Sequence, residues 1–283
     1  MYTILVVIHS MQRMATCLCG IWDVTEGERG AQELDTCVVK HLEANAKDHE
    51  RVILYSDCCG GQNRNIKMAL SLLKYVNNSN NKTKITEHKF LESGYSYLPN
   101  DSDFGLVEKK AHQQREILFD DWVDIAKTAK RKPFQVTVMQ YDDLLSTQLL
   151  ENSVTKQKRT VDRKDINWLK IKWLRFERGP SFTIKFKETH NSDIDFYSIS
   201  LNKSQGRPLS SFAVVGQEKL YTTRGKSNRT EEKGYDGFIP FISPSQHAFF
   251  INLPVPVNTK SGQKHHASNN EQDYSDDEPL YDI

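Results

Sequence analysis

The sequence lacks the features that would place it in several common classes of protein. It has no Cys-x-x-Cys pair, so we expect no structural zinc site. Its odd number of cysteines, in Cys-x-Cys and Cys-Cys spacing, does not suit a disulfide framework, and we expect reduced thiols in a nuclear or cytoplasmic protein. No run approaches the roughly 18 apolar residues that span a membrane. The N-terminus has neither a basic segment nor a small-residue cleavage site, so it predicts a strand rather than a signal peptide, and no membrane partner is expected.

The chain also lacks a strong overall charge, since its formal net charge is +1. No global field therefore favours a polyanion. The charge is nevertheless uneven, because residues 151–235 hold 18 Lys and Arg against 10 Asp and Glu. Residues 260–283 hold 2 Lys against 6 Asp and Glu. We expect a basic second half and, over residues 258–283, a disordered acidic tail with no core of its own.

Apolar patterning over residues 1–132 predicts a mixed α/β domain. Short β-branched runs indicate strands, and apolar stripes at helical spacing indicate helices. In chain order the expected strands are Thr3–His9, Met14–Trp22, Val52–Ser56 and Lys84–Phe90; the expected helices are Gly30–Leu42, Asn63–Val76 and Asp120–Lys130; and Tyr97–Gly105 is expected to be a loop. The first two strands are close enough in the chain to pair as a hairpin.

Residues 133–257 form a second region, which we expect to be basic and mainly β. Phe134–Met139, Trp168–Phe176 and Phe182–Phe186 alternate in part between apolar and polar residues. Such alternation predicts antiparallel strands with one exposed basic face.

The stretch Ile53–Asn65, ILYSDCCGGQNRN, places Asp57 at the exit of an apolar strand. It lacks the Gly-Lys-Ser/Thr ending of a phosphate-binding P-loop. Asn63 is better placed than Asp57 to cap the following helix. The spacing alone leaves two alternatives open for Asp57, a metal ligand or an ordinary loop acid.

Three further carboxylates are candidates, each with a simpler alternative. Glu33 stands at the start of an expected helix, where a negative charge is favourable in its own right. Asp101 and Asp103 lie in LPNDSDFG, which is also good turn chemistry.

Three segments, RGAQELDTC, YSDCCGGQNRN and HKFLESGYSYLPNDSDFG, resemble in their order the motifs of a family of transposon-derived, ribonuclease H-like (DDE-type transposase-like) proteins of insects and other animals. The resemblance covers roughly residues 1–180 and includes INWLKIKWLRF. It implies a ribonuclease H-like mixed sheet flanked by helices. It also implies two-metal phosphodiester chemistry on DNA with Mg²⁺ or Mn²⁺. The catalytic residues would be Glu33, Asp57, Asp101 and Asp103, and the metal ligands Glu33, Asp57 and Asp103.

Two departures from the family pattern lead us to expect a nuclease-like domain that is inactive or incomplete. Family members carry an upstream strand with an Asp-Leu-Gln element that supplies the first acid. The present sequence starts after it, and TILVVIHS has no carboxylate. Where the family usually has Gly-His, this chain has Gly94-Tyr95, and a tyrosine with a pKa near 10 is poorly suited to proton transfer at neutral pH.

The alternative is a non-catalytic nucleic-acid-binding or protein-interaction module that uses the basic region. DNA is the partner implied, and the sequence indicates no particular protein partner. Short basic runs can bind phosphates, although they are often plain solvated faces. The candidate nucleic-acid contacts are Gln62, Arg64, Lys156, Lys158, Arg159, Lys170, Lys172 and Arg175.

Overall fold

The computed structural model describes residues 3–9, 17–23, 25–91, 99–113, 119–155, 159–179, 182–202 and 215–224. Its strands are β1 (Thr3–His9), β2 (Cys17–Asp23), β3 (Arg51–Ser56), β4 (Ile85–Phe90), β5 (Gln135–Val138), β6 (Trp173–Glu177), β7 (Thr183–Lys187) and β8 (Tyr197–Ser200). Its α-helices are α1 (Ala31–Asn45), α2 (Ile66–Asn77), α3 (Pro99–Ala111), α4 (Phe119–Thr128) and α5 (Gln148–Ser153), and two 3₁₀ turns are η1 (Tyr141–Asp143) and η2 (Trp168–Lys170). The acidic tail expected over residues 258–283 lies outside the described residues.

The strands form two sheets, each with parallel and antiparallel pairs. The three-stranded sheet has the order β1-β2-β5, in which β1 and β2 are the antiparallel hairpin that the sequence predicted. The five-stranded sheet has the order β3-β4-β6-β7-β8, parallel between β3 and β4 and antiparallel from there on. The expected mixed α/β class is therefore present. The resemblance implied one ribonuclease H-like mixed sheet, whereas the described strands form two mixed sheets.

The two regions expected on either side of residue 132 share their sheets. β5 pairs with β2, and β6 pairs with β4. Among the described strands, β1 ends one sheet and β3 ends the other, so each has a neighbour on one side only.

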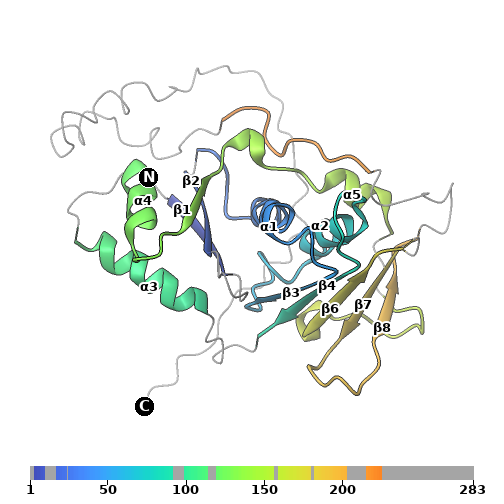
Figure 1. The fold of residues 1–283 in the computed structure, drawn as a ribbon. Coiled ribbons are helices and arrows are strands. Elements are labelled where there is room, and N and C mark those ends of the chain that lie inside the picture. Colours follow the sequence, from blue (N-terminus) through green and yellow to red (C-terminus); the bar gives the residue numbers. More distant parts are fainter. Residues whose placement is uncertain are drawn as a thin grey trace, which may run out of the picture.

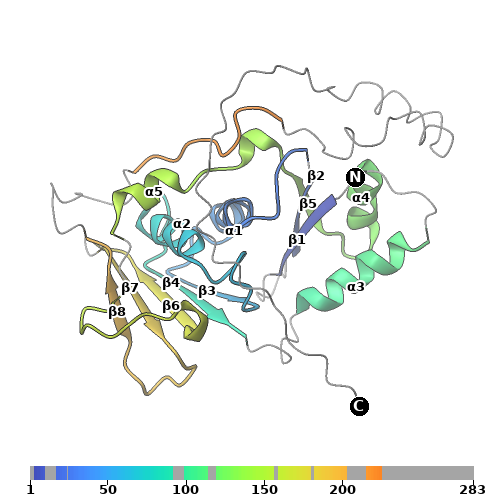
Figure 2. The same cartoon turned by 180° about the vertical axis from the view of Figure 1, so that it is seen from behind.

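Helices lie on both sides of the three-stranded sheet (Figures 1 and 2). α3 and α4 pack against one another through Val107, Ala111, Ile125 and Ala126, together with Phe134 just before β5. α1 lies on the opposite side, where Cys37 contacts Trp22 of β2. The sheet is thus covered on both faces.

The five-stranded sheet has its helices on one face. α2 contributes most of the core there, because Met68, Ala69, Leu72, Leu73 and Val76 repeat at helical spacing and are all buried. They meet the side chains of Phe90, Leu174, Phe176, Ile184 and Phe186, which alternate along three neighbouring strands. Since strand side chains alternate between faces, the intervening residues project to the opposite face.

Two sequence predictions about helix boundaries were wrong. α2 begins at Ile66, and its N-cap is Asn65, whose side chain accepts a hydrogen bond from the Met68 amide at 3.0 Å; Asn63 is not the cap. The segment expected to be a loop at Tyr97–Gly105 instead enters α3 at Pro99. Proline and acidic residues suit the first turn of a helix as well as a tight turn, which explains the error.

None of the helices in the described part of the chain is both long and apolar enough to cross a membrane.

Candidate functional site

Asp57 follows β3 directly and organises the loop after it. Its Oδ1 accepts hydrogen bonds from the Asn63 side chain at 2.6 Å and from the Cys59 amide at 3.2 Å. The Cys59 carbonyl in turn accepts from the amides of Asn63 and Arg64, at 2.8 and 3.0 Å. Asp57 is exposed, and the two groups that donate to its carboxylate, from Asn63 and Cys59, belong to its own loop.

Glu33 lies in the first turn of α1, and its carboxylate is turned inward. The residue is 4% exposed. Its Oε1 accepts a hydrogen bond from the Tyr221 hydroxyl and another from the Glu28 amide at 3.3 Å. The Glu33 carboxylate, expected at a helix start, therefore accepts a hydrogen bond from a residue far along the chain.

Tyr221 belongs to residues 215–224, which we name the strap because they cross α1, α2 and the segment before α5. The Leu220 amide donates to the Leu144 carbonyl at 2.7 Å, and the Ser146 amide donates to the Glu218 carbonyl at 2.8 Å. Arg224 pairs with Glu26 at 2.5 Å. No periodic pattern predicts the strap, because the stretch of sequence around it is polar and weakly patterned.

Asp103 and Asp101 lie on α3, where they have different surroundings. Asp103 is 7% exposed and pairs with Lys130 at 3.0 Å. Asp101 is exposed in the first turn of the helix. Gly94 and Tyr95, where the family usually has Gly-His, lie outside the described residues.

The four candidate carboxylates do not assemble a metal site. Within the ranges given above, no group of three or more His, Cys, Asp or Glu side chains could hold a metal ion. Glu33, Asp57 and Asp103 are therefore not members of any such group in the described part of the chain. The physical reason is that each carboxylate is directed to a different local partner: the strap, its own loop and Lys130, respectively.

A buried histidine adjoins this region. His88 of β4 is fully enclosed, and burial lowers the pKa of its imidazole to about 3. Its Nε2 lies 2.9 Å from the Ser56 hydroxyl, at the end of β3. His88 therefore stays neutral inside the core over most of the pH range.

The opposite face of the five-stranded sheet, which we name the outer face, carries two rows of register neighbours. One row runs through Tyr55, Lys89, Trp173 and Lys187. The next row runs through Ile53, Glu87, Arg175 and Lys185. Tyr55 is 46% exposed and Ile53 39% exposed, so this face is open at the β3 end.

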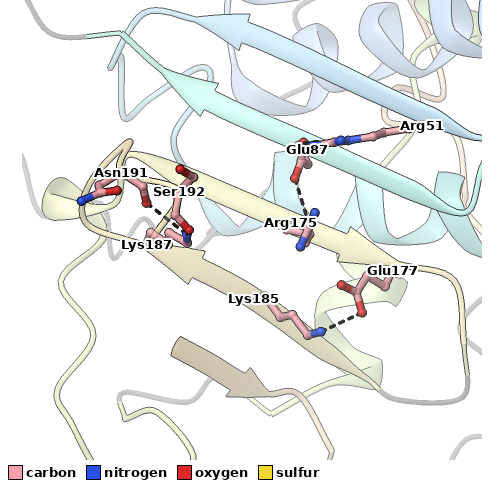
Figure 3. A network of polar contacts seen from close by, with 8 residues as sticks. All are labelled: Arg51, Glu87, Arg175, Glu177, Lys185, Lys187, Asn191 and Ser192. Carbon is pink, nitrogen blue, oxygen red and sulfur yellow. Dashed lines mark hydrogen bonds and ion pairs between the residues drawn. The ribbon is translucent and has the colours of Figure 1, made fainter. Parts of the chain in front are cut away.

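In the second row, the buried carboxylate of Glu87 lies between two arginines (Figure 3). Glu87 is 0% exposed and accepts from Arg51 Nη2 at 2.7 Å and from Arg175 Nε at 2.9 Å. Nearby, Lys185 pairs with Glu177 at 2.7 Å. Both acids of the outer face are thus already paired with cations of the same face.

Cations and aromatic rings alternate along the first row. Lys89 Nζ lies 3.9 Å from the centroid of the Trp173 ring and 5.8 Å from that of Tyr55. Lys187 Nζ lies 4.9 Å from the Trp173 ring and 4.4 Å from the ring of Phe196, and it donates to the carbonyls of Asn191 and Ser192. At the β7 end of the row the side chains therefore cover one another, and Trp173 is only 7% exposed.

The predicted nucleic-acid contacts are scattered relative to this face. Arg175 lies on it, whereas Lys170 is in η2 and Lys172 precedes β6. Arg159 pairs with Asp165 at 3.0 Å, away from the sheet rows. Gln62 and Arg64 lie in the Asp57 loop, and Lys156 and Lys158 are outside the described residues.

Four other cations of the outer face were not predicted from the sequence: Arg51, Lys89, Lys185 and Lys187. Strand side chains alternate between faces, so TIKFK could have predicted that Lys185 and Lys187 share a face. In the same way, WLRFE could have predicted that Trp173 and Arg175 share a face. Pairing between the strands then joins these residues in space.

No protein-family model, no curated protein and no solved structure matches the chain. The likeness to transposon-derived, ribonuclease H-like proteins therefore rests on the three sequence motifs alone.

Proposed function

We propose that this chain is a nucleic-acid-binding domain of transposase descent, and that the outer face of the five-stranded sheet is its binding surface. One observation carries the proposal: the outer face holds four cations that are at least partly exposed, Arg51, Lys89, Arg175 and Lys185, against two carboxylates, Glu87 and Glu177, while a fifth cation, Lys187, is buried. A cluster of one sign on one face attracts a polyanion even when the whole chain is nearly neutral.

The arrangement of the acids strengthens this positive face. Glu87 lies beneath Arg51 and Arg175, so its charge is enclosed while both guanidinium groups remain partly exposed, at 51% and 25% of their side-chain surface. Arginine forks and lysines are the donors that contact phosphate oxygens. The accessible layer of the outer face therefore remains positive, with Arg51, Lys89, Arg175 and Lys185 against the one exposed carboxylate of Glu177.

Nucleic acid is favoured over an acidic protein because an exposed aromatic ring stands among the cations. Tyr55 offers a ring for a base, while Lys89 beside it offers a charge for a phosphate. The motif resemblance to transposon-derived proteins supports the same class of partner. No catalytic step is proposed, because the described carboxylates do not fit a metal pair.

The proposal is tested by fluorescence anisotropy with labelled DNA over a series of salt concentrations. We expect binding at low salt that weakens linearly on a log–log plot, since phosphate contacts release counterions. Lys89→Ala and Lys185→Ala should each lower the affinity and reduce the salt slope by about one unit.

Lys127→Ala is the control for Lys185→Ala, because Lys127 is likewise partly exposed and ion-paired but lies on α4 instead of the five-stranded sheet. Its affinity should equal that of the wild type. EDTA should leave binding unchanged, since no metal takes part in the proposed contacts. The proposal fails if the wild-type protein does not bind at low salt, or if Lys127→Ala weakens binding as much as the two outer-face variants.

A further inference from the structure

We infer that the outer face selects single-stranded nucleic acid, with one base stacked on Tyr55. This inference rests on the proposed function and adds the class of ligand. It starts from the first row of register neighbours, in which aromatic and cationic side chains alternate: Tyr55, Lys89, Trp173, Lys187 and, beyond them, Phe196.

Within that row only Tyr55 has a free ring. Trp173 is 7% exposed and has both Lys89 and Lys187 over its ring. Phe196 is contacted by Lys187 and by Arg175, at 4.4 and 5.0 Å from its ring centroid. Tyr55 is 46% exposed, and Lys89 Nζ lies 5.8 Å from its ring centroid but 3.9 Å from that of Trp173.

The surroundings of Tyr55 suit a base with its phosphate. Ile53, two residues earlier on β3, projects to the same face and is 39% exposed, so it extends the apolar contact. Lys89 is the register neighbour of Tyr55 on β4, about 4.8 Å away in backbone spacing. Arg51 begins the same strand and stands on the same face. One nucleotide can therefore meet a ring, an aliphatic surface and a cation together.

The width of the sheet argues against a duplex as the preferred ligand. Five strands cover four spacings, or about 19 Å, whereas the major groove of DNA is about 12 Å wide. The outer face cannot enter that groove, so a duplex would meet the cations only through its phosphates. In a duplex the base faces are stacked on one another, and a ring lying on a sheet reaches them only in a single strand.

The lysine between two aromatic rings also explains why the platform is limited to one base. Because Lys89 lies 3.9 Å above Trp173, the second ring of the row is already covered by a cation from the same protein. A strand crossing the outer face therefore gains one stacking contact and several ionic contacts. Its affinity should depend on sequence only weakly, since every base has a face that can stack.

The inference is tested by anisotropy with three labelled probes of equal length: oligo-dT, oligo-U and a mixed-sequence DNA duplex. Wild type, Tyr55→Ala and Tyr55→Phe are compared on each probe at one low salt concentration. We expect either single-stranded probe to bind more tightly than the duplex. Tyr55→Ala should weaken single-strand binding by about 5- to 150-fold, and Tyr55→Phe should retain it, because a phenyl ring still stacks.

The duplex probe and the folding control make the outcomes distinct. Tyr55 is about half exposed and lies on an end strand of the described sheet, so Tyr55→Ala should still fold, which a thermal melt compared with that of the wild type checks. If the duplex binds as tightly as the single strands, or if Tyr55→Ala weakens all three probes equally, selection of single strands is refuted while the proposed function stands. If no probe binds, the proposed function itself fails.

Discussion

The buried carboxylate Glu87 gives a prediction in which stability and binding change in opposite directions. Glu87→Gln removes the negative charge beneath Arg51 and Arg175 while keeping the size of the side chain. Breaking a fully buried ion pair by changing one partner costs about 3–5 kcal/mol of unfolding free energy. Here the two arginines are 51% and 25% exposed, so water can take up part of their hydration.

We therefore expect Glu87→Gln to lower the free energy of unfolding by about 2–3 kcal/mol. For a domain of this size, that loss corresponds to a drop in Tm of about 4–12 °C. The variant also raises the net charge of the outer face by one unit, because it removes a carboxylate. Its affinity for single-stranded DNA should therefore rise at low salt, and the rise should disappear as salt increases.

Glu177→Gln is the matched control because it adds the same charge at an exposed pair. Glu177 and Lys185 are 37% and 38% exposed, so their ion pair contributes at most about 1 kcal/mol. Thermal melts and anisotropy titrations of both variants separate the two effects. A Tm for Glu87→Gln within about 1 °C of wild type would refute the buried network. Weaker DNA binding by a folded Glu87→Gln would refute the role of charge on the outer face.

Three further changes test other parts of the structure. Native His88 has a pKa of about 3 and an unfolded histidine has one of about 6.5, so the unfolded chain binds more protons between these pH values. The free energy of unfolding therefore decreases as pH falls through this range. His88→Leu should make that decrease smaller, as measured by urea unfolding at several pH values. Asn65→Ala removes the N-cap of α2 and should lower the free energy of unfolding by about 1 kcal/mol in a denaturation assay. Asn63→Ala leaves that N-cap in place, so it should not show this loss. Tyr221→Phe removes the hydroxyl that donates to Glu33, so hydrogen exchange in the strap should become faster; unchanged exchange would contradict the contact.

The sequence predicted most elements whose side chains repeat with a regular period. β1 and β4 were expected within a residue of their observed bounds, and α4 within two. Their apolar residues either form a continuous run or follow one face, which is a local signal. α3 was missed because its first residues, Pro99 to Asp101, serve equally well in a turn and at the start of a helix.

Antiparallel strands with one exposed basic face were expected over Trp168–Phe176 and Phe182–Phe186. β6 and β7 are antiparallel, and Arg175 and Lys185 on their outer face are partly exposed, whereas Trp173 and Lys187 are buried. Lys170 and Lys172 were chosen because they alternate, yet β6 begins at Trp173, so the outer positions are Trp173 and Arg175. Strand phase depends on partners: Lys89 meets Trp173 only through the pairing of β4 with β6.

The strap could not be predicted from the sequence, because it is held by isolated long-range contacts. Its fixed points are isolated contacts, such as Tyr221 with Glu33 and Arg224 with Glu26, between residues that are nearly 200 positions apart. No periodicity accompanies such contacts.

The ends of the two sheets have a consequence for how this protein behaves at high concentration. β1 and β3 each leave one side of the strand without a neighbour in the described part of the chain, and β1 is the β-branched run TILVVIH. A strand of that composition with unpaired amides and carbonyls is a template on which a further strand can grow. Purified protein should therefore self-associate as concentration rises, and a charged residue introduced into the free edge of β1 should keep it dispersed.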